Sequence, residues 1–212
     1  MSKYLINRRA KILDKALEMF NERGIEYVGL RELAAILNMR VSNITYYFPT
    51  KDDLVYELSR QLSESNAGII VSTKDLSMEG FLQMLHRVFQ NHIQFRCLLL
   101  SVVHLLKQNK HMASSYKKTQ DIRNSTMLAN LKELEAGGYL VLKETDEMDF
   151  LVSTLSLISR FWISEVDVSN RQWNTQKQIH HYLKLVTTLL IPYSTSKGKK
   201  EMDKFMEASN LS

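Results

Sequence analysis

Apolar residues recur at helical spacing through the first third of the chain. One stripe runs from Ile12 to Phe20 and ends at Gly24, and a second runs from Leu30 to Leu37. A short apolar segment follows from about Arg40 to Phe48, and a fourth helix starts behind it. Thr50 can cap that helix, and the two aspartates in its first turn suit the positive end of the helix dipole. The pattern therefore predicts three short helices followed by a connecting helix.

A second block of longer and more apolar helices follows a polar stretch, Ser65 to Ser77. We expect its five helices at about Phe81 to Ile93, Leu98 to Leu106, Ser114 to Ala136, Glu147 to Glu165 and Thr175 to Leu190. Gly137-Gly138 suits a left-handed cap after the third of them. The lysine-rich last segment is expected to fray, although Met202 and Phe205 can dock. The chain thus divides into a small module that contacts a partner and a larger module that buries apolar surface.

The composition agrees with an all-α fold. Seven Gly and two Pro among 212 residues are too few for the frequent tight turns of strand-rich folds. The single cysteine, Cys97, excludes an internal disulfide and a thiolate zinc site. We find no signal peptide and no apolar run long enough for a bilayer, so we expect a cytoplasmic protein without membrane contact. The net charge of +5 permits contact with a polyanion but does not establish it.

A turn of helix-turn-helix length joins the second and third predicted helices at Asn38-Met39. Asparagine tolerates the left-handed conformation that such a turn needs, and the small Ala34 lets two helices approach closely. Ile44 and Phe48 are spaced to pack inward. The outward positions and their neighbours are then candidates for contacting DNA. They are Arg31, Arg40, Val41, Ser42, Asn43, Thr45, Tyr46, Tyr47 and Lys51.

These side chains suit two kinds of contact with DNA. Serine, threonine and asparagine exchange hydrogen bonds with base edges in the major groove, and Asn43 can pair bidentately with adenine. Arg40 suits guanine or phosphate, whereas Arg31 and Lys51 suit phosphates. Helix spacing alone favours an ordinary bundle with a solvated polar face over a DNA-binding surface.

The charge balance of the N-terminal part bears on affinity. Residues 1–60 hold ten Lys or Arg and eight Asp or Glu, an excess of only two. Tight binding to DNA should therefore need a dimer, which doubles the phosphate contacts. A basic arm can add to these contacts. It consists of Lys3, Arg8, Arg9 and Lys11.

Three stretches carry a resemblance to a known family: residues 12–20 with the following Gly24, residues 30–34, and residues 44–54, which read ITYYFPTKDDL. Together they make the chain from Ala10 to about Leu62 similar to the DNA-binding domain of TetR-family transcriptional regulators. Departures from the family pattern include Gly29, where a threonine commonly caps the second helix and touches phosphate.

The resemblance implies an architecture and a function. It implies a helix-turn-helix DNA-binding domain at 5–65, with the motif at about 29–48, a helical dimerisation and effector-binding domain at 66–195, and a basic tail at 196–212. It implies a homodimeric repressor, not an enzyme, that binds a palindromic DNA operator and is released by a small-molecule effector. One alternative is a DNA-binding regulator without such a ligand, controlled by a protein partner. A helical enzyme is a second alternative, but we find no polar constellation that it would need, and we expect no cofactor.

The C-terminal block offers candidates for an effector pocket and for a dimer interface. Pocket candidates are Met84, His86, Phe89, His92, His104, Met127, Phe161 and Trp162, each of which ordinary core packing also explains. Interface candidates are Phe150, Leu151, Leu155, Ile158, Ile179, Leu183, Val186 and Leu190, which can equally be internal core. The histidines lack the spacing of metal ligands, so we expect no metal.

Overall fold

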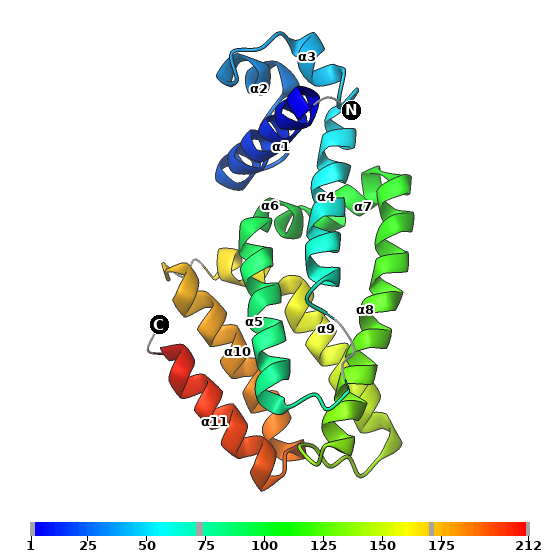
Figure 1. Ribbon diagram of the computed structural model, residues 1–212, viewed down its shortest axis with the longest axis vertical. Helices are drawn as coiled ribbons and strands as arrows, with labels where there is room; N and C mark the ends of the chain where they lie inside the picture. Colours follow the sequence, from blue (N-terminus) through cyan, green and yellow to red (C-terminus); the bar gives the residue numbers. More distant parts are fainter. Residues whose placement is uncertain (1–2, 71–73, 170–171, 211–212) are drawn as a thin grey trace. The chain divides into compact units, whose positions relative to one another are not determined.

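The computed structural model describes residues 3–70, 74–169 and 172–210, and within these ranges the chain is all-α (Figure 1). Its α-helices are α1 (Lys3–Arg23), α2 (Leu30–Ile36), α3 (Val41–Thr45), α4 (Lys51–Ala67), α5 (Met78–Gln94), α6 (Arg96–Leu100), α7 (Val102–Gln108), α8 (Lys110–Ala136), α9 (Thr145–Val168), α10 (Thr175–Leu190) and α11 (Ser196–Asn210). No helix in the described ranges is both long and apolar enough to span a membrane. The predicted fold class, an N-terminal helix-turn-helix domain followed by a helical bundle, is confirmed.

The helices form two compact units. Unit 1 comprises Met1–Glu64 and Phe95–Tyr116, and unit 2 comprises Ser65–Gln94 and Lys117–Ser212. The sequence placed the whole of 66–195 in one domain, whereas α6, α7 and the start of α8 pack with the N-terminal helices. Met112 of α8 and Leu105 of α7 belong to the same buried cluster as the helix-turn-helix core.

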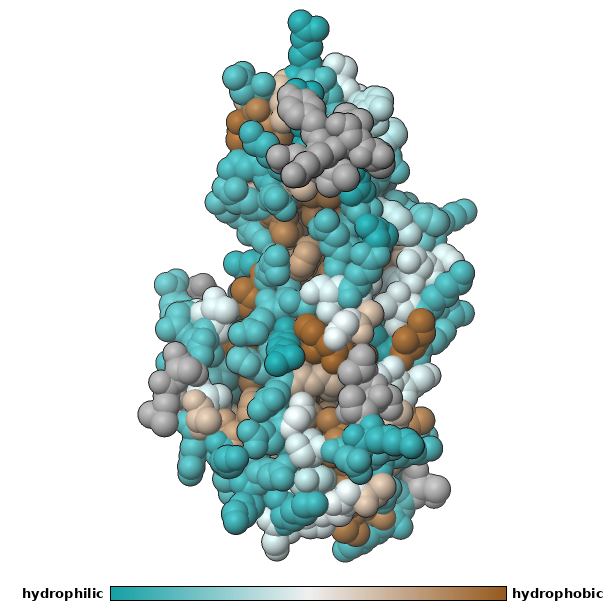
Figure 2. All heavy atoms as spheres, viewed as in Figure 1, coloured by the Kyte–Doolittle hydropathy of each residue, from teal (hydrophilic) through white to brown (hydrophobic). Residues whose placement is uncertain are grey.

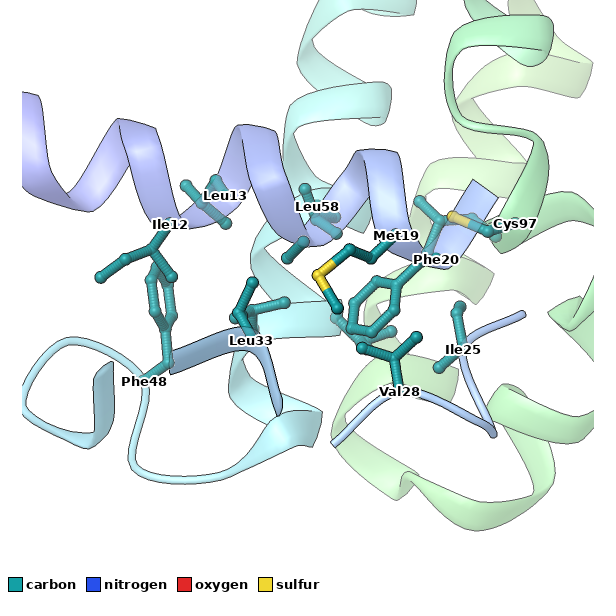
Figure 3. Packing of buried hydrophobic residues seen from close by; sticks show 14 of the residues in the cluster. Ile12, Leu13, Met19, Phe20, Ile25, Val28, Leu33, Phe48, Leu58 and Cys97 are labelled. Carbon is teal, nitrogen blue, oxygen red and sulfur yellow. The ribbon is translucent and has the colours of Figure 1, made fainter. Parts of the chain in front are cut away.

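Unit 1 is held by apolar side chains from α1, α2, α4 and α6. In Figure 3, Ile12 lies next to the ring of Phe48, and Phe20 lies next to Val28. Phe20 and Phe48 are both almost completely buried, as is Leu58 of α4. The Asn21 side-chain oxygen accepts a hydrogen bond from the Cys97 backbone N–H (3.0 Å), which joins α1 to α6. Burial raises the pKa of the Cys97 thiol to about 12, so this side chain is an uncharged core group.

Unit 2 is built around α5. Helices α5, α10 and α11 run side by side, and α9 packs against both α5 and α10 (Figure 1). The apolar stripe of α10 is buried from Ile179 to Leu190, and its predicted bounds, Thr175 to Leu190, are confirmed.

Two sequence predictions on elements are wrong. The single helix expected from Leu98 to Leu106 is two helices that break at Ser101, where the backbone leaves the helical conformation (φ −94°, ψ 5°). The tail does not fray, because 196–210 forms α11 and buries Met202 and Phe205. An ion pair between Lys204 and Glu79 (3.2 Å) adds to the docking of α11 on α5.

Candidate functional site

The turn between α2 and α3 has the geometry that its sequence predicts. Asn38 adopts a left-handed conformation, with φ at 53°. The Met39 N–H donates to the Ala34 carbonyl (2.9 Å), and the Asn38 N–H donates to the Ala35 carbonyl (3.0 Å). Ala34 is 1% exposed, so its small side chain is buried at this helix crossing. The turn therefore fixes the direction in which α3 leaves α2.

Helix α3 presents its polar side chains to solvent and its apolar side chains to the core. Ile44 and Phe48 are buried, as expected. Arg40, Val41, Ser42, Asn43 and Tyr46 are exposed, and Thr45 and Tyr47 are half-buried. Tyr46 is 74% exposed and packs edge-on against the ring of Tyr47, with ring centroids 5.0 Å apart. This exposed surface is of a kind that can enter a groove and read base edges.

Arg9 fixes the end of the α3 segment to α4. Its guanidinium lies over the Phe48 ring, 5.1 Å from the ring centroid, and pairs with the Glu57 carboxylate at 2.9 Å. Glu57 also accepts hydrogen bonds from Arg60 (2.7 and 3.1 Å), and Arg60 and Arg9 hold the pKa of Glu57 below its usual value. The sequence placed Arg9 in a DNA-binding arm, and the structure adds an ion pair between Arg9 and Glu57 inside unit 1.

Lys51 is the first residue of α4 and follows Thr50, the expected N-cap. Thr50 Oγ1 accepts from the Asp53 backbone N–H (3.2 Å), while Asp53 Oδ2 accepts from the Thr50 N–H (2.9 Å) and from its hydroxyl (2.7 Å). The Lys51 ammonium donates to the Glu26 carbonyl (3.3 Å), which ties α4 to the loop before α2. Partial burial lowers the pKa of Lys51 from its usual value. An ammonium has three donors, so Lys51 can still reach a phosphate.

Arg31 is exposed in the first turn of α2, next to Gly29. Gly29 is the N-cap and supplies no side-chain hydrogen bond to that turn, unlike the threonine common in the resembled family. The backbone of Gly29 is extended, and a side chain added there meets no atom within 4 Å. The helix-turn-helix surface therefore lacks a side chain at position 29 that could contact phosphate, although the backbone there leaves room for one.

Taken together, a small Ala-lined helix crossing, a left-handed turn and a solvent-facing polar helix define a DNA-binding protein of the helix-turn-helix class. Two protein-family models match the chain. The model described as "Bacterial regulatory proteins, tetR family" matches residues 12–58, and the model described as "Bacterial transcriptional repressor" matches residues 58–202. The second match covers more than half of the chain, and the chain belongs to the TetR family of transcriptional regulators. It is a DNA-binding regulator and not an enzyme.

Individual relatives agree with this membership. The HTH-type transcriptional regulator LuxR of Vibrio harveyi is 30% identical over 75 residues, which are 35% of this chain and 37% of LuxR. A TetR-family regulator from Marinobacter aquaeolei VT8 shares the fold over 99% of both chains, with a TM-score of 0.86 and 19% identity. The ketosteroid regulator KstR2 of Mycobacterium tuberculosis has a TM-score of 0.66 over 89% of this chain and 96% of its own, with 16% identity.

The pocket candidates do not all belong to one unit. His104 is exposed on α7, in unit 1, whereas the other seven lie on α5, α8 and α9 of unit 2. Met84, Phe89, His92, Met127 and Trp162 are buried there, and His86 and Phe161 are half-buried. The helical pattern around His104 gave no sign that α7 packs with the N-terminal helices.

His92 and Trp162 meet in the core of unit 2. The Trp162 indole N–H donates to His92 Nδ1 at 3.1 Å, and the Phe89 ring lies 5.0 Å from the Trp162 ring. Burial, and to a lesser extent the nearby charge of Arg123, lowers the pKa of His92 to about 3. The imidazole is therefore uncharged at neutral pH and accepts a hydrogen bond. In the described part of the chain, no three His, Cys, Asp or Glu residues gather closely enough to hold a metal ion.

Most of the interface candidates are core residues of a single chain. Leu151, Leu155, Ile179, Leu183, Val186 and Leu190 are at most 3% exposed without any partner, so they cannot supply a surface for one. The prediction for these six is wrong because helical spacing identifies an apolar face but does not tell whether that face packs inside the chain or against a partner. Phe150 is 50% exposed and Ile158 is half-buried, so these two remain candidates.

The outward face of α9 carries an apolar stripe of its own. Phe150, Leu157, Phe161 and Val168 are spaced 7, 4 and 7 residues apart, which places them on one face of the helix. Leu157 is 57% exposed and Val168 is 87% exposed. The face of the molecule seen in Figure 2 is mostly hydrophilic, with apolar residues in small separate patches. We call these four residues the α9 outer stripe.

Replacing Lys51 with alanine should weaken binding to operator and to unrelated DNA by similar factors, since a phosphate contact carries no sequence information. The loss of one phosphate contact in each subunit of a dimer should reduce the log–log slope of affinity against salt by about two. Fluorescence anisotropy over a salt series measures this slope. Lys51→Arg keeps the charge and should keep the slope, whereas an unchanged slope in Lys51→Ala contradicts the assignment.

Proposed function

We propose that the chain is a ligand-responsive repressor that binds a palindromic operator as a homodimer in the cytoplasm. The observation that carries the DNA-reading part is the set of exposed polar side chains on α3, aimed outward by the turn at Asn38. We assign base contacts to Asn43, Ser42 and Arg40. Phosphate contacts go to Arg31, Thr45, Tyr47 and Lys51, with Val41 and Tyr46 packing against the groove.

Two observations support the dimer. The α9 outer stripe exposes several large apolar side chains to water on one face of a helix, which is unfavourable. In a dimer with a twofold axis through this face, the stripe of one subunit would be covered by the same stripe of the other. The small charge excess of the N-terminal module also makes a single copy a weak binder. A dimer sets two copies of α3 at a spacing that matches successive major grooves.

Repression and ligand control are supported by the description of the family model over residues 58–202 and by the core of unit 2. That core includes uncharged polar groups, His92 among them, and four methionines whose flexible side chains adapt to different shapes. An effector acts only through its different affinities for the DNA-bound and free states of the dimer.

Selection of binding sites from random DNA, with wild type and Asn43→Ala in parallel, tests the reading surface. We expect wild type to select an inverted repeat. Asn43→Ala should lose preference at one position in each half-site, since a bidentate pair discriminates by roughly 1–3 kcal/mol. Ser63→Ala, on α4 away from α3, is the control and should return the wild-type motif. Identical motifs from wild type and Asn43→Ala would remove Asn43 from the base contacts.

A further inference from the structure

The interior of unit 2 holds polar atoms that lack hydrogen-bond partners. Asn130 of α8 is completely buried, and its side-chain oxygen has no partner. Its nitrogen lies 3.5 Å from the Met84 sulfur, a weak acceptor. Tyr182 of α10 is 3% exposed, and its hydroxyl also lacks a partner. A buried polar group without a partner is unfavourable, and native proteins retain few of them without a reason.

Tyr182 adjoins the His92–Trp162 pair, and Asn130 is connected to the same core through Met84 of α5. The Trp162 ring is 5.2 Å from the Tyr182 ring and hydrogen-bonded to His92. Met84 lies eight residues before His92 on the same face of α5, about 12 Å along the helix axis. Met127, also buried, lies one turn before Asn130 on α8. We call this set the interior polar cluster. It consists of Met84, His92, Met127, Asn130, Trp162 and Tyr182.

The cluster has a defined chemical character. A carboxamide offers an acceptor and a donor side by side, whichever way the amide is turned. The group that satisfies both has a donor next to an acceptor, as another amide has. His92 is uncharged at neutral pH, and the cluster contains no carboxylate, lysine or arginine, so a charged ligand group gains no counter-ion from it. The surrounding methionine and aromatic side chains suit an apolar body.

We propose that the interior polar cluster binds an uncharged, mostly apolar ligand whose amide-like group pairs with Asn130. This deepens the proposed ligand control by naming the class of effector and the residue that selects it. Protein interiors are close-packed, so the ligand displaces side chains as it enters. Met84 and Met127 are the unbranched members of the cluster and make that space by rotation. The Tyr182 hydroxyl supplies a further hydrogen bond to ligands long enough to reach it.

Titration calorimetry on the full chain tests the proposal with four eight-carbon probes that differ in their polar group. Octanamide offers a donor and an acceptor, octan-2-one an acceptor, octanoate a negative charge and octylammonium a positive charge. We expect octanamide to bind about tenfold more tightly than octan-2-one, because the ketone has no donor and leaves one hydrogen bond to Asn130 unmade. Both ions should bind more weakly than octanamide.

Asn130→Leu distinguishes a ligand contact from a purely structural role, because loss of a structural role would not change the preference for octanamide over octan-2-one. Its nearly isosteric apolar side chain should lower the affinity for octanamide about tenfold while leaving that for octan-2-one within about threefold. Asn124→Leu is the control. Asn124 lies on the same helix with partners in Gln120 (2.9 Å) and Ser156 (3.0 Å), and its loss should keep the preference for octanamide.

The outcomes separate this proposal from the proposed function. Equal binding of octanamide and octan-2-one, or no binding of any probe at about 1 mM, overturns the amide site. Tighter binding of octanoate, which the nearby Arg123 would favour, overturns it too, and leaves ligand control intact if octanoate lowers operator affinity. A preference for octanamide that Asn130→Leu removes supports the site, even if operator affinity is unchanged and ligand control fails.

Discussion

Leu157→Glu should convert the protein from dimer to monomer at concentrations where wild type is fully dimeric. Leu157 lies in the middle of the α9 outer stripe and is 57% exposed in the single chain. In a twofold interface through this stripe, each dimer would bury two new carboxylates near the symmetry axis. Unpaired buried charge is strongly unfavourable, so we expect the dimer dissociation constant to rise about 100-fold or more. Sedimentation equilibrium measures this constant.

Loss of the dimer should also remove specific operator binding. A monomer has half of the phosphate contacts and reads only one half-site, so its affinity for the palindrome should fall toward that for unrelated DNA. Ile122→Glu is the matched control, because Ile122 is 67% exposed on α8 and receives the same change outside the stripe. If Leu157→Glu sediments as wild type does, the interface lies elsewhere.

The exposed and buried faces of α3 were predictable from sequence because local rules determine them. The turn needs a left-handed residue, and Asn38 is one of the few non-glycine residues that adopt φ near 53° readily. The inward positions, Ile44 and Phe48, follow from spacing alone. The ion pair of Arg9 was missed since its partner Glu57 lies 48 residues away in the sequence, and a charge pattern cannot show that pairing.

The interior of unit 2 was only partly predictable. His92 and Trp162 were singled out by residue type, but their hydrogen bond joins residues 70 apart, which no local rule reveals. Asn130 was missed because a polar residue within a polar helix is expected to face solvent. Its burial depends on how α8 packs against other helices. The docking of α11 was underestimated for a similar reason, since its lysines outnumber the apolar residues that it buries.

Gly198→Ala should destabilise unit 2 by about 2–4 kcal/mol through overpacking. Gly198 is buried in the first turn of α11, and a methyl group there would lie 2.4 Å from the Tyr139 carbonyl oxygen. The backbone must shift to relieve this contact, because a carbonyl cannot rotate away as a flexible side chain can. For a chain of this length, the expected loss in melting temperature is about 5–12 °C.

The shift would break a set of hydrogen bonds that joins the α8–α9 connection to the start of α11. Tyr139 O accepts from the Thr195 N–H (3.0 Å), and Gly138 O accepts from the Thr195 hydroxyl (2.8 Å). Lys197 donates to Gly137 O (2.9 Å), and its ammonium lies 3.9 Å from the centroid of the Tyr139 ring. Losing them together should release α11 from α5 and expose apolar side chains that it now buries.

Differential scanning calorimetry gives the total effect, and hydrogen exchange locates it. Amides of α11 and of the facing part of α5 should lose protection in Gly198→Ala, while those of α1 and α2 in unit 1 should keep theirs. Gly80→Ala is the control within a helix of the same unit. An added methyl there meets only side-chain atoms of Ser77 and Leu76, at 3.3 and 3.5 Å, so helix propensity should raise stability by up to about 1 kcal/mol. Equal melting temperatures for wild type and Gly198→Ala would show that the Tyr139 carbonyl yields to a methyl group, and that close backbone contact does not hold α11 in place.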